Sequence, residues 1–205
     1  DKVDRLRDPT SGLLPHRIDA DGTVREGPRG SSLAIIHTFL PELTPTAATD
    51  WASFHSRFVT REAGLIGIRE YPAGMSGLGD VDSGPLVLGV SLSASAVTLG
   101  AARANGDAAL AMALDREAEF LALPWEWAGR RSFVAGVLPV GDAFVAWARS
   151  VPLADASEPS PATPFAWSLA LLTGMLVAPI VLAPAVYLLL RRRRRHRAAA
   201  RPPAR

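Results

Sequence analysis

Cysteine is absent from the 205 residues, which excludes disulfides, thiolate metal sites and a catalytic thiol. Methionine is absent from the first position, so either a leader was removed or the chain is a piece of a longer protein. Residues 1–7 read like the last turns of a helix with no cap residue before it, which favours a fragment. Hydrophobic residues nevertheless make up 48% of the chain, enough to build a core. We therefore expect one folded domain with appended segments.

Acidic residues are missing from the C-terminal end. All 20 Asp and Glu precede residue 160, whereas eight of the 22 Lys and Arg lie in residues 191–205. The other 14 basic residues leave residues 1–190 with a net charge of −6, against +8 for the last fifteen. A mildly acidic body argues against nucleic acid as a partner.

The motifs of several enzyme classes are missing as well. There is no Walker A sequence, the residues around Ser76 do not have the G-x-S-x-G spacing, and the four histidines show no H-E-x-x-H spacing. Asp19 and Asp21 resemble the start of a calcium loop, but Pro28 stands where the bidentate Glu is needed. We expect no metal ion and no cofactor.

A long apolar run does occur near the C-terminus. Residues 165–190 are 26 uncharged, mostly apolar residues, followed at once by an Arg-rich run at 191–197. As a helix they would measure about 39 Å, against about 30 Å for the hydrocarbon core of a bilayer. An Arg run can also mark nucleic-acid binding, but beside this apolar stretch it is typical of a cytoplasmic flank. The sequence predicts a single-pass cell-membrane protein with its bulk outside, the lipid bilayer as a partner and a cytoplasmic C-terminus.

A second uncharged stretch, residues 84–102, competes for the bilayer. It contains four hydroxyl side chains and two internal glycines, so its hydropathy is modest. We expect it to be part of a helix at 85–104, buried inside the exposed domain, rather than a second membrane span.

The remaining pattern predicts helices joined by loops. Helical spacing or capping residues indicate helices at 31–40, 45–61, 85–104, 108–122 and 138–150, with Pro41 ending the first and Asp107 capping the fourth. Residues 13–25 indicate one short β-hairpin. The predicted fold class is all-α, built from helical hairpins of an (α/α)-toroid type, possibly a partial barrel, with that one β-hairpin and a C-terminal transmembrane helix.

Four segments follow from this pattern. We expect an extracytoplasmic helical domain at 1–150, a Pro-rich linker at 151–164, a transmembrane helix at 165–190 and a basic cytoplasmic tail at 191–205.

Three carboxylates, Glu70, Asp80 and Asp82, lie within thirteen residues just before the predicted helix 85–104. A helix N-terminus favours anions, so these groups are candidates for general acid–base catalysis or for binding sugar hydroxyls or a cation. The alternative is that Asp82 or Ser83 only caps the helix. Two like charges at i and i+2 require compensation, for which Arg69, Arg17, a cation or a substrate is the candidate.

Further polar and aromatic residues are candidates for substrate binding. Tryptophan beside Glu and Arg is a common way to stack on a sugar ring, although such residues more often plug a core. The predicted substrate-binding residues are His16, Arg17, Arg69, Tyr71, Trp125 and Trp127.

Several of these residues carry a family resemblance. The segments 12–17, 30–32, 69–72 and 79–85 resemble actinobacterial membrane-anchored proteins with a helical toroid. More distantly, they are similar to the (α/α)-barrel families that include linalool dehydratase/isomerase and glycan-active enzymes. The resemblance covers residues 1–150 and implies the C-terminal half of such a barrel. Linalool dehydratase/isomerase relies on cysteines, so its activity is not implied here.

These observations predict a membrane-anchored cell-envelope protein whose outer domain binds or processes a glycan or lipid-linked substrate. The alternatives are a non-catalytic binding domain and an accessory subunit of a membrane complex with membrane-protein partners. The sequence does not decide whether the chain is an enzyme.

Overall fold

The computed structural model describes residues 3–62, 64–122, 124–133 and 139–154. The chain divides into two units, Asp1–Ala162 and Thr163–Arg205, and the second lies wholly outside the described residues. The predicted transmembrane helix, the cytoplasmic tail and linker residues 155–164 lie outside them too. Within the described ranges, no helix is long and apolar enough to span a bilayer.

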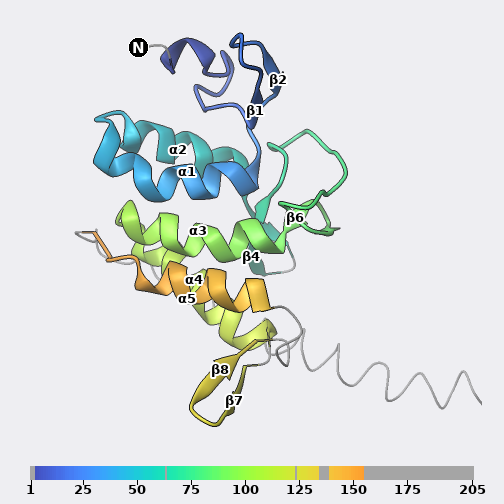
Figure 1. The fold of residues 1–205 in the computed structure, drawn as a ribbon, viewed down its shortest axis with the longest axis vertical. Helices are drawn as coiled ribbons and strands as arrows, with labels where there is room; N and C mark the ends of the chain where they lie inside the picture. Colours follow the sequence, from blue (N-terminus) through green and yellow to red (C-terminus); the bar gives the residue numbers. More distant parts are fainter. Residues whose placement is uncertain (1–2, 63, 123, 134–138, 155–205) are drawn as a thin grey trace, which may run out of the picture. The chain divides into compact units, whose positions relative to one another are not determined.

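The described part of the first unit contains five α-helices (Figure 1). Helix α3 packs against α1, α4 and α5 and against strand β4, so it lies at the centre of the helical part. Small residues allow these close approaches: a Cβ at Gly100 of α3 would lie 3.3 Å from Cα of Ala148 in α5. The helices are α1 (Gly30–Leu43), α2 (Ala47–Phe58), α3 (Leu92–Ala104), α4 (Ala108–Leu121) and α5 (Pro139–Ser150).

Three antiparallel sheets complete the described part of the unit. One has four strands in the order β3-β4-β6-β5, and the other two are the hairpins β1-β2 and β7-β8. A short 3₁₀ turn, η1 (Asp4–Leu6), precedes them. The strands are β1 (Arg17–Ile18), β2 (Val24–Glu26), β3 (Val59–Glu62), β4 (Leu65–Arg69), β5 (Leu86–Val87), β6 (Val90–Ser91), β7 (Trp125–Trp127) and β8 (Arg130–Ser132).

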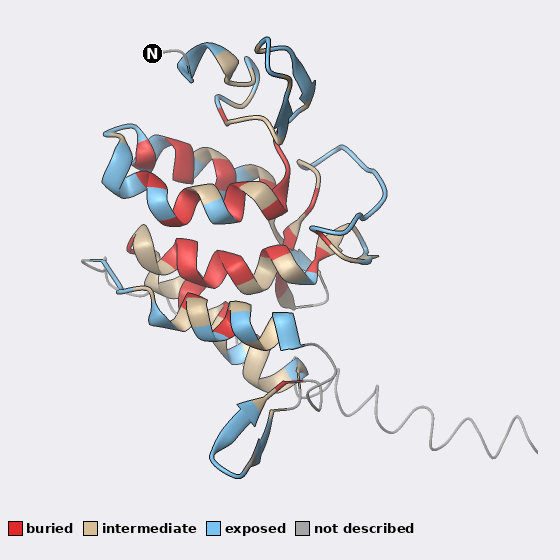
Figure 2. Cartoon of the chain, viewed as in Figure 1, coloured by how far each residue is buried: buried red, intermediate tan, exposed pale blue. Residues whose placement is uncertain are grey.

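The hydrophobic core lies where α1, α2, α3, α4 and β4 meet. Phe54, Phe58 and Ile68 are fully buried there, and the rings of Phe54 and Phe58 stack with their centroids 5.4 Å apart. Figure 2 shows the buried residues concentrated on these elements, whereas residues 73–82 are exposed throughout. The exposed loop therefore leaves the core directly after β4.

The predicted all-α fold class is wrong, because the structure has a four-stranded sheet beside the helices and is mixed α/β. Residues 59–61, assigned by pattern to a helix, pair instead with β4 from Val59↔Ile68 to Glu62↔Leu65. β-branched residues at Val59 and Thr60 favour this extended pairing. The helical-toroid architecture that the resemblance implied is corrected in the same way.

The predicted helix 85–104 begins seven residues late, at Leu92. Residues 86–91 form the β5–β6 hairpin, and the side chain of Ser91 caps α3 by accepting a hydrogen bond from the N–H of Ala94 at 3.1 Å. Asp80, Asp82 and Ser83 therefore do not lie at a helix N-terminus.

Other predicted elements are confirmed with shifted ends. The hairpin near residues 13–25 forms, and Asp107 caps α4 by accepting from the N–H of Leu110 at 3.0 Å. Helix α1 does not end before Pro41 but continues to Leu43. Proline inside a helix leaves the carbonyl four residues earlier without its donor, and here a side chain from the end of α3 supplies one.

Candidate functional site

The guanidinium of Arg29, just before α1, joins three carboxylates, one close in sequence and two from a distant part of the chain. Its Nε donates to Oε1 of Glu70 at 2.7 Å, and its Nη1 lies 2.6 Å from Oδ2 of Asp80. Nη1 also donates to Oε2 of Glu26 at 3.2 Å. The Arg29 side chain is only 6% exposed; burial lowers its pKa, but the contacts with Asp80 and Glu70 outweigh this and hold the pKa above the usual range. We call Arg29, Glu26, Glu70 and Asp80 the Arg29 cluster.

Glu70 is fully buried at the end of β4 and caps helix α1. Its Oε1 accepts from the hydroxyl of Ser31 at 2.8 Å, and its Oε2 accepts from the N–H of Ser31 at 3.1 Å. The N–H of Gly30 donates to the Glu70 carbonyl at 2.9 Å. A Cβ at position 30 would lie 2.0 Å from the Arg69 carbonyl, so only glycine permits this approach. The negative charge therefore lies at the N-terminus of α1, where free N–H groups and the helix dipole favour it.

Asp80 is held by its own loop as well as by Arg29. Its Oδ1 accepts from the N–H groups of Asp82 and Ser83, each at 3.0 Å. These contacts lower the pKa of Asp80 to about 2; the hydrogen bond from the N–H of Ser83 contributes most, burial opposes it, and Arg29 adds to the lowering. The carboxylate is therefore ionised at neutral pH and fixed in place.

Asp82, predicted as a catalytic partner of Asp80, does not join the Arg29 cluster. It is exposed, and only its backbone makes these contacts: its N–H donates to Oδ1 of Asp80, and its carbonyl accepts from the hydroxyl of Ser93 at 2.7 Å. The compensating cation expected for the Asp80–Asp82 pair is Arg29, not Arg69 or Arg17.

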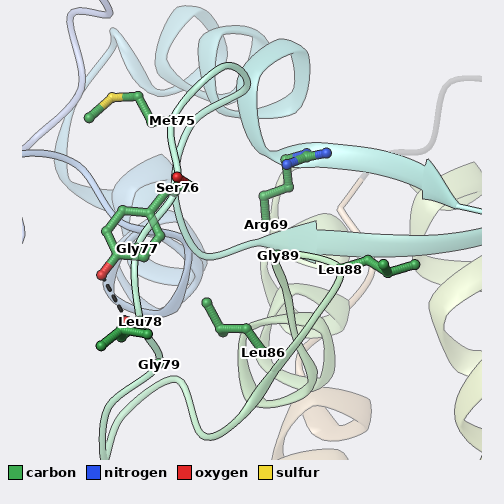
Figure 3. Close-up of a pocket in the computed structure, with 10 residues that line it drawn as sticks. Arg69, Met75, Ser76, Gly77, Leu78, Gly79, Leu86, Leu88 and Gly89 are labelled. Atoms are coloured by element: carbon green, nitrogen blue, oxygen red, sulfur yellow. Dashed lines mark hydrogen bonds between the residues drawn. The ribbon is translucent and has the colours of Figure 1, made fainter.

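Tyr71 follows Glu70 and faces both the cluster and the exposed loop. The Arg29 guanidinium lies 5.2 Å from its ring centroid, and its hydroxyl donates to the Leu78 carbonyl at 2.9 Å (Figure 3). A Cβ at Gly77 would lie 2.3 Å from Cζ of Tyr71, so glycine allows the loop to close against the ring.

A cavity of about 420 Å³ lies between this loop and the β5–β6 hairpin; it is open to solvent and not enclosed. We call it the loop cavity. Figure 3 shows its lining residues coming from the end of β4, the loop and the hairpin; the side chains of Met75, Arg69 and Leu88 extend outward rather than toward one another. The lining residues are Arg69, Tyr71, Met75, Ser76, Gly77, Leu78, Gly79, Leu86, Leu88 and Gly89.

The predicted binding residues His16 and Arg17 lie beside the Arg29 cluster, where both approach Glu26. His16 Nδ1 is 2.7 Å from the Ser32 hydroxyl, and its Nε2 is 4.0 Å from Oε2 of Glu26. Arg17 Nη1 lies 3.9 Å from Oε1 of Glu26. Arg69 lines the loop cavity and pairs with Glu62 at 3.3 Å.

Trp125 and Trp127 are not brought to this site. Both belong to β7, and the β7–β8 hairpin lies at the opposite end of the described region from β1–β2 (Figure 1). Trp125 is 61% exposed there. The structure therefore separates the predicted aromatic sugar platform from the predicted carboxylates.

The geometry favours binding over acid–base catalysis. A general acid or base works best with a pKa near the operating pH and must reach the substrate. The pKa of Asp80 is about 2, and both oxygens of the buried Glu70 are occupied by Arg29 and Ser31. Within the described part of the chain no three His, Cys, Asp or Glu side chains are grouped as for a metal ion. The carboxylates of the cluster converge on Arg29 instead.

Sequence reasoning missed Arg29 and Glu26. The unbalanced charge of Glu70, Asp80 and Asp82 indicated that a cation was needed, but Arg29 lies 41 residues from Glu70 and no spacing rule links them. Comparison of the chain with protein-family models, with curated proteins and with solved structures finds no match. Function is therefore inferred from the geometry of this site.

Proposed function

We propose that the chain is a single-pass membrane protein whose described domain binds a lipid-linked ligand in the loop cavity without transforming it. The observation that supports this is the cavity itself. Its volume of about 420 Å³ falls within the range of small-ligand sites, roughly 300–1,000 Å³. Its walls include the Tyr71 ring and three leucines, Leu78, Leu86 and Leu88.

The lining suits a ligand with an apolar part and a polar part. Leu78, Leu86 and Leu88 offer aliphatic surface, which favours a hydrocarbon chain. Ser76 and Arg69 offer a hydroxyl and a charged donor, which suit a glycan or phosphate-bearing head group. A free sugar would leave the aliphatic wall in contact with water, so the lipid-linked form is the favoured ligand.

The Arg29 cluster supports this function as a scaffold. It fixes Tyr71 through the guanidinium above the ring and fixes the loop through Asp80. Tyr71 and the loop side of the cavity are thereby positioned before a ligand arrives, which reduces the ordering cost of binding.

The test is a binding measurement on the full chain in detergent micelles. The probe is a radiolabelled polyprenyl-phosphate-linked monosaccharide, compared with the free monosaccharide. We expect the lipid-linked probe to bind at least tenfold more tightly than the free sugar and to be recovered chemically unchanged. Equal affinities, or cleavage of the probe, would contradict the proposal.

Gly77→Ala tests the cavity. Gly77 does not lie at positive φ, so alanine fits the backbone but drives the Tyr71 ring from its position. We expect at least a tenfold loss of probe affinity. Gly27→Ala is the matched control, because a Cβ there meets nothing within 4 Å. Unchanged binding by Gly77→Ala would exclude the loop cavity as the site.

A further inference from the structure

Large apolar side chains are exposed along the loop and hairpin that border the open loop cavity. Leu78 is 88% exposed, Val81 fully exposed and Leu88 74% exposed. Figure 2 shows this segment as one of the exposed parts of the described unit. We call the set the apolar rim; its members are Met75, Leu78, Val81, Val87, Leu88 and Leu92.

Leu88 has an unusual backbone for its side chain. With Gly89 it forms the two-residue turn of the β5–β6 hairpin, and both residues have positive φ, 52° and 81°. Such turns favour Asn, Asp and Gly, and a leucine in the left-handed region costs about 1 kcal/mol or more. The side chain is exposed, so burial within the domain does not offset the strain. A strained, exposed leucine at a loop tip indicates a contact outside the domain.

The same chain supplies a nearby bilayer if residues 165–190 cross it as predicted. Ala154, the last described residue, is held by its N–H to the carbonyl of Arg103 at 2.9 Å, near the C-terminal end of α3. Ten residues separate it from residue 165 and can span about 31 Å when extended. Helix α3 has 13 residues, about 20 Å, and begins at Leu92 of the rim. The tether is therefore long enough for the rim to reach the membrane surface.

We infer that the apolar rim inserts into the lipid bilayer and opens the loop cavity to a ligand taken from the membrane. This inference rests on the membrane attachment in the proposed function. Asp82 lies exposed within the rim, next to Val81, so anionic head groups oppose the contact and zwitterionic lipid favours it.

The absence of cysteine makes the test direct, because each introduced cysteine is the only one to react. The full chain, with Leu78→Cys or Leu88→Cys labelled by an environment-sensitive fluorophore, is reconstituted into phosphatidylcholine vesicles that contain spin-labelled lipid. We expect a blue shift and at least twofold quenching at both positions. Replacing half of the lipid by phosphatidylglycerol should reduce the quenching.

Leu43→Cys is the matched control, because Leu43 is 76% exposed but lies at the end of α1. It should show emission typical of water. Quenching at position 43 without quenching at positions 78 and 88 would overturn the proposal, as would water-like emission at all three. A blue shift at position 88 that depends on protein concentration and not on vesicles would show that a second copy covers the rim.

A pair of asparagine variants separates insertion from folding. Ala128 has the same turn position in the β7–β8 hairpin, with φ of 51°. Leu88→Asn and Ala128→Asn should both raise the melting temperature, because asparagine tolerates this conformation better. Only Leu88→Asn should halve the quenching at position 78. Equal quenching in the two variants would overturn the proposal.

These measurements also distinguish this inference from the proposed function. Quenching is recorded without ligand, so it persists if the loop cavity binds nothing. Vesicle flotation tests the membrane attachment through residues 165–190 separately. A chain that does not float with the vesicles refutes both the attachment and the insertion of the apolar rim.

Discussion

The side-chain amide of Asn105 donates to the carbonyl of His37 at 2.8 Å, the oxygen that Pro41 leaves without its helical donor. The same amide group donates to the Ala101 carbonyl at the end of α3, also at 2.8 Å. One residue therefore joins the interruption in α1 to the end of α3.

This relationship predicts a coupling between positions 41 and 105. Asn105→Ala leaves a buried carbonyl without a partner, so the free energy of unfolding should fall by about 1–3 kcal/mol. With Pro41→Ala in the same chain, the restored N–H can donate to His37 and the cost of Asn105→Ala should be smaller. Chemical denaturation of the four variants in the cycle measures this; equal costs in both backgrounds would rule out the coupling.

Asp80 and Asp82 should respond differently to neutralisation. Asp80→Asn loses the ion pair with Arg29 and should lower the free energy of unfolding by about 1 kcal/mol. Asp82→Asn removes an exposed charge outside the Arg29 cluster and should change it by less than about 0.5 kcal/mol. Thermal melts of the two variants check the difference, and an equal loss in both would contradict the assignment of Asp80 to the cluster.

His37 should make the fold sensitive to mild acid. It is buried against Trp51 and Phe54, and neither ring nitrogen has a hydrogen-bond partner among the residues that the structure describes. Burial lowers its pKa to about 4, with the charge of Arg7 adding to the effect. Between about pH 6.5 and 4 the unfolded chain binds more protons than the folded chain. The free energy of unfolding should therefore decrease as the pH is lowered, by up to about 3 kcal/mol. Denaturation curves of His37→Leu should lack this slope; an unchanged slope would assign it elsewhere.

Glu117 should act in the opposite direction. Its Oε1 accepts from the N–H of Ile66 at 2.7 Å, and burial raises its pKa to about 6, although that bond and Arg61 oppose the shift. The folded chain binds more protons between about pH 4.5 and 6, so stability is lost as the pH rises through that range.

Glu117→Gln keeps the acceptor for Ile66 without the buried charge. It should therefore raise the free energy of unfolding by about 1–2 kcal/mol at pH 7.5 and have little effect at pH 4.5. A gain of equal size at both pH values would show that the charge is not its cause.

The helices were the more predictable part of the fold. Asp107 stands at an N-cap, and apolar residues recur at helical spacing through α4, so its bounds follow closely from local sequence. The strands were less predictable because several have only two or three residues, too few for an alternating pattern to appear. Leu86 and Val87 belong to the same uncharged run as α3, so the sequence does not distinguish them from the helix; they are a strand because they pair with β6.

The candidate site also contains residues that could be predicted from the sequence and one that could not. Glu70, Asp80, Tyr71, His16 and Arg17 were predicted, and the structure places all five in or beside the Arg29 cluster. Arg29 itself could not be predicted, because its role depends on the end of β4 meeting the start of α1. Trp125 was grouped with them by chemistry alone, and the topology places it on a separate hairpin.

The capping of α1 by Glu70 also has a consequence for biosynthesis. The cap lies 39 residues after Ser31, so α1 leaves the ribosome well before the carboxylate that completes its first turn. A 14-residue helix is marginal in water when isolated. Helix α1 is therefore stabilised only after β4 has been synthesised and has docked, and its packing against α3 comes later still.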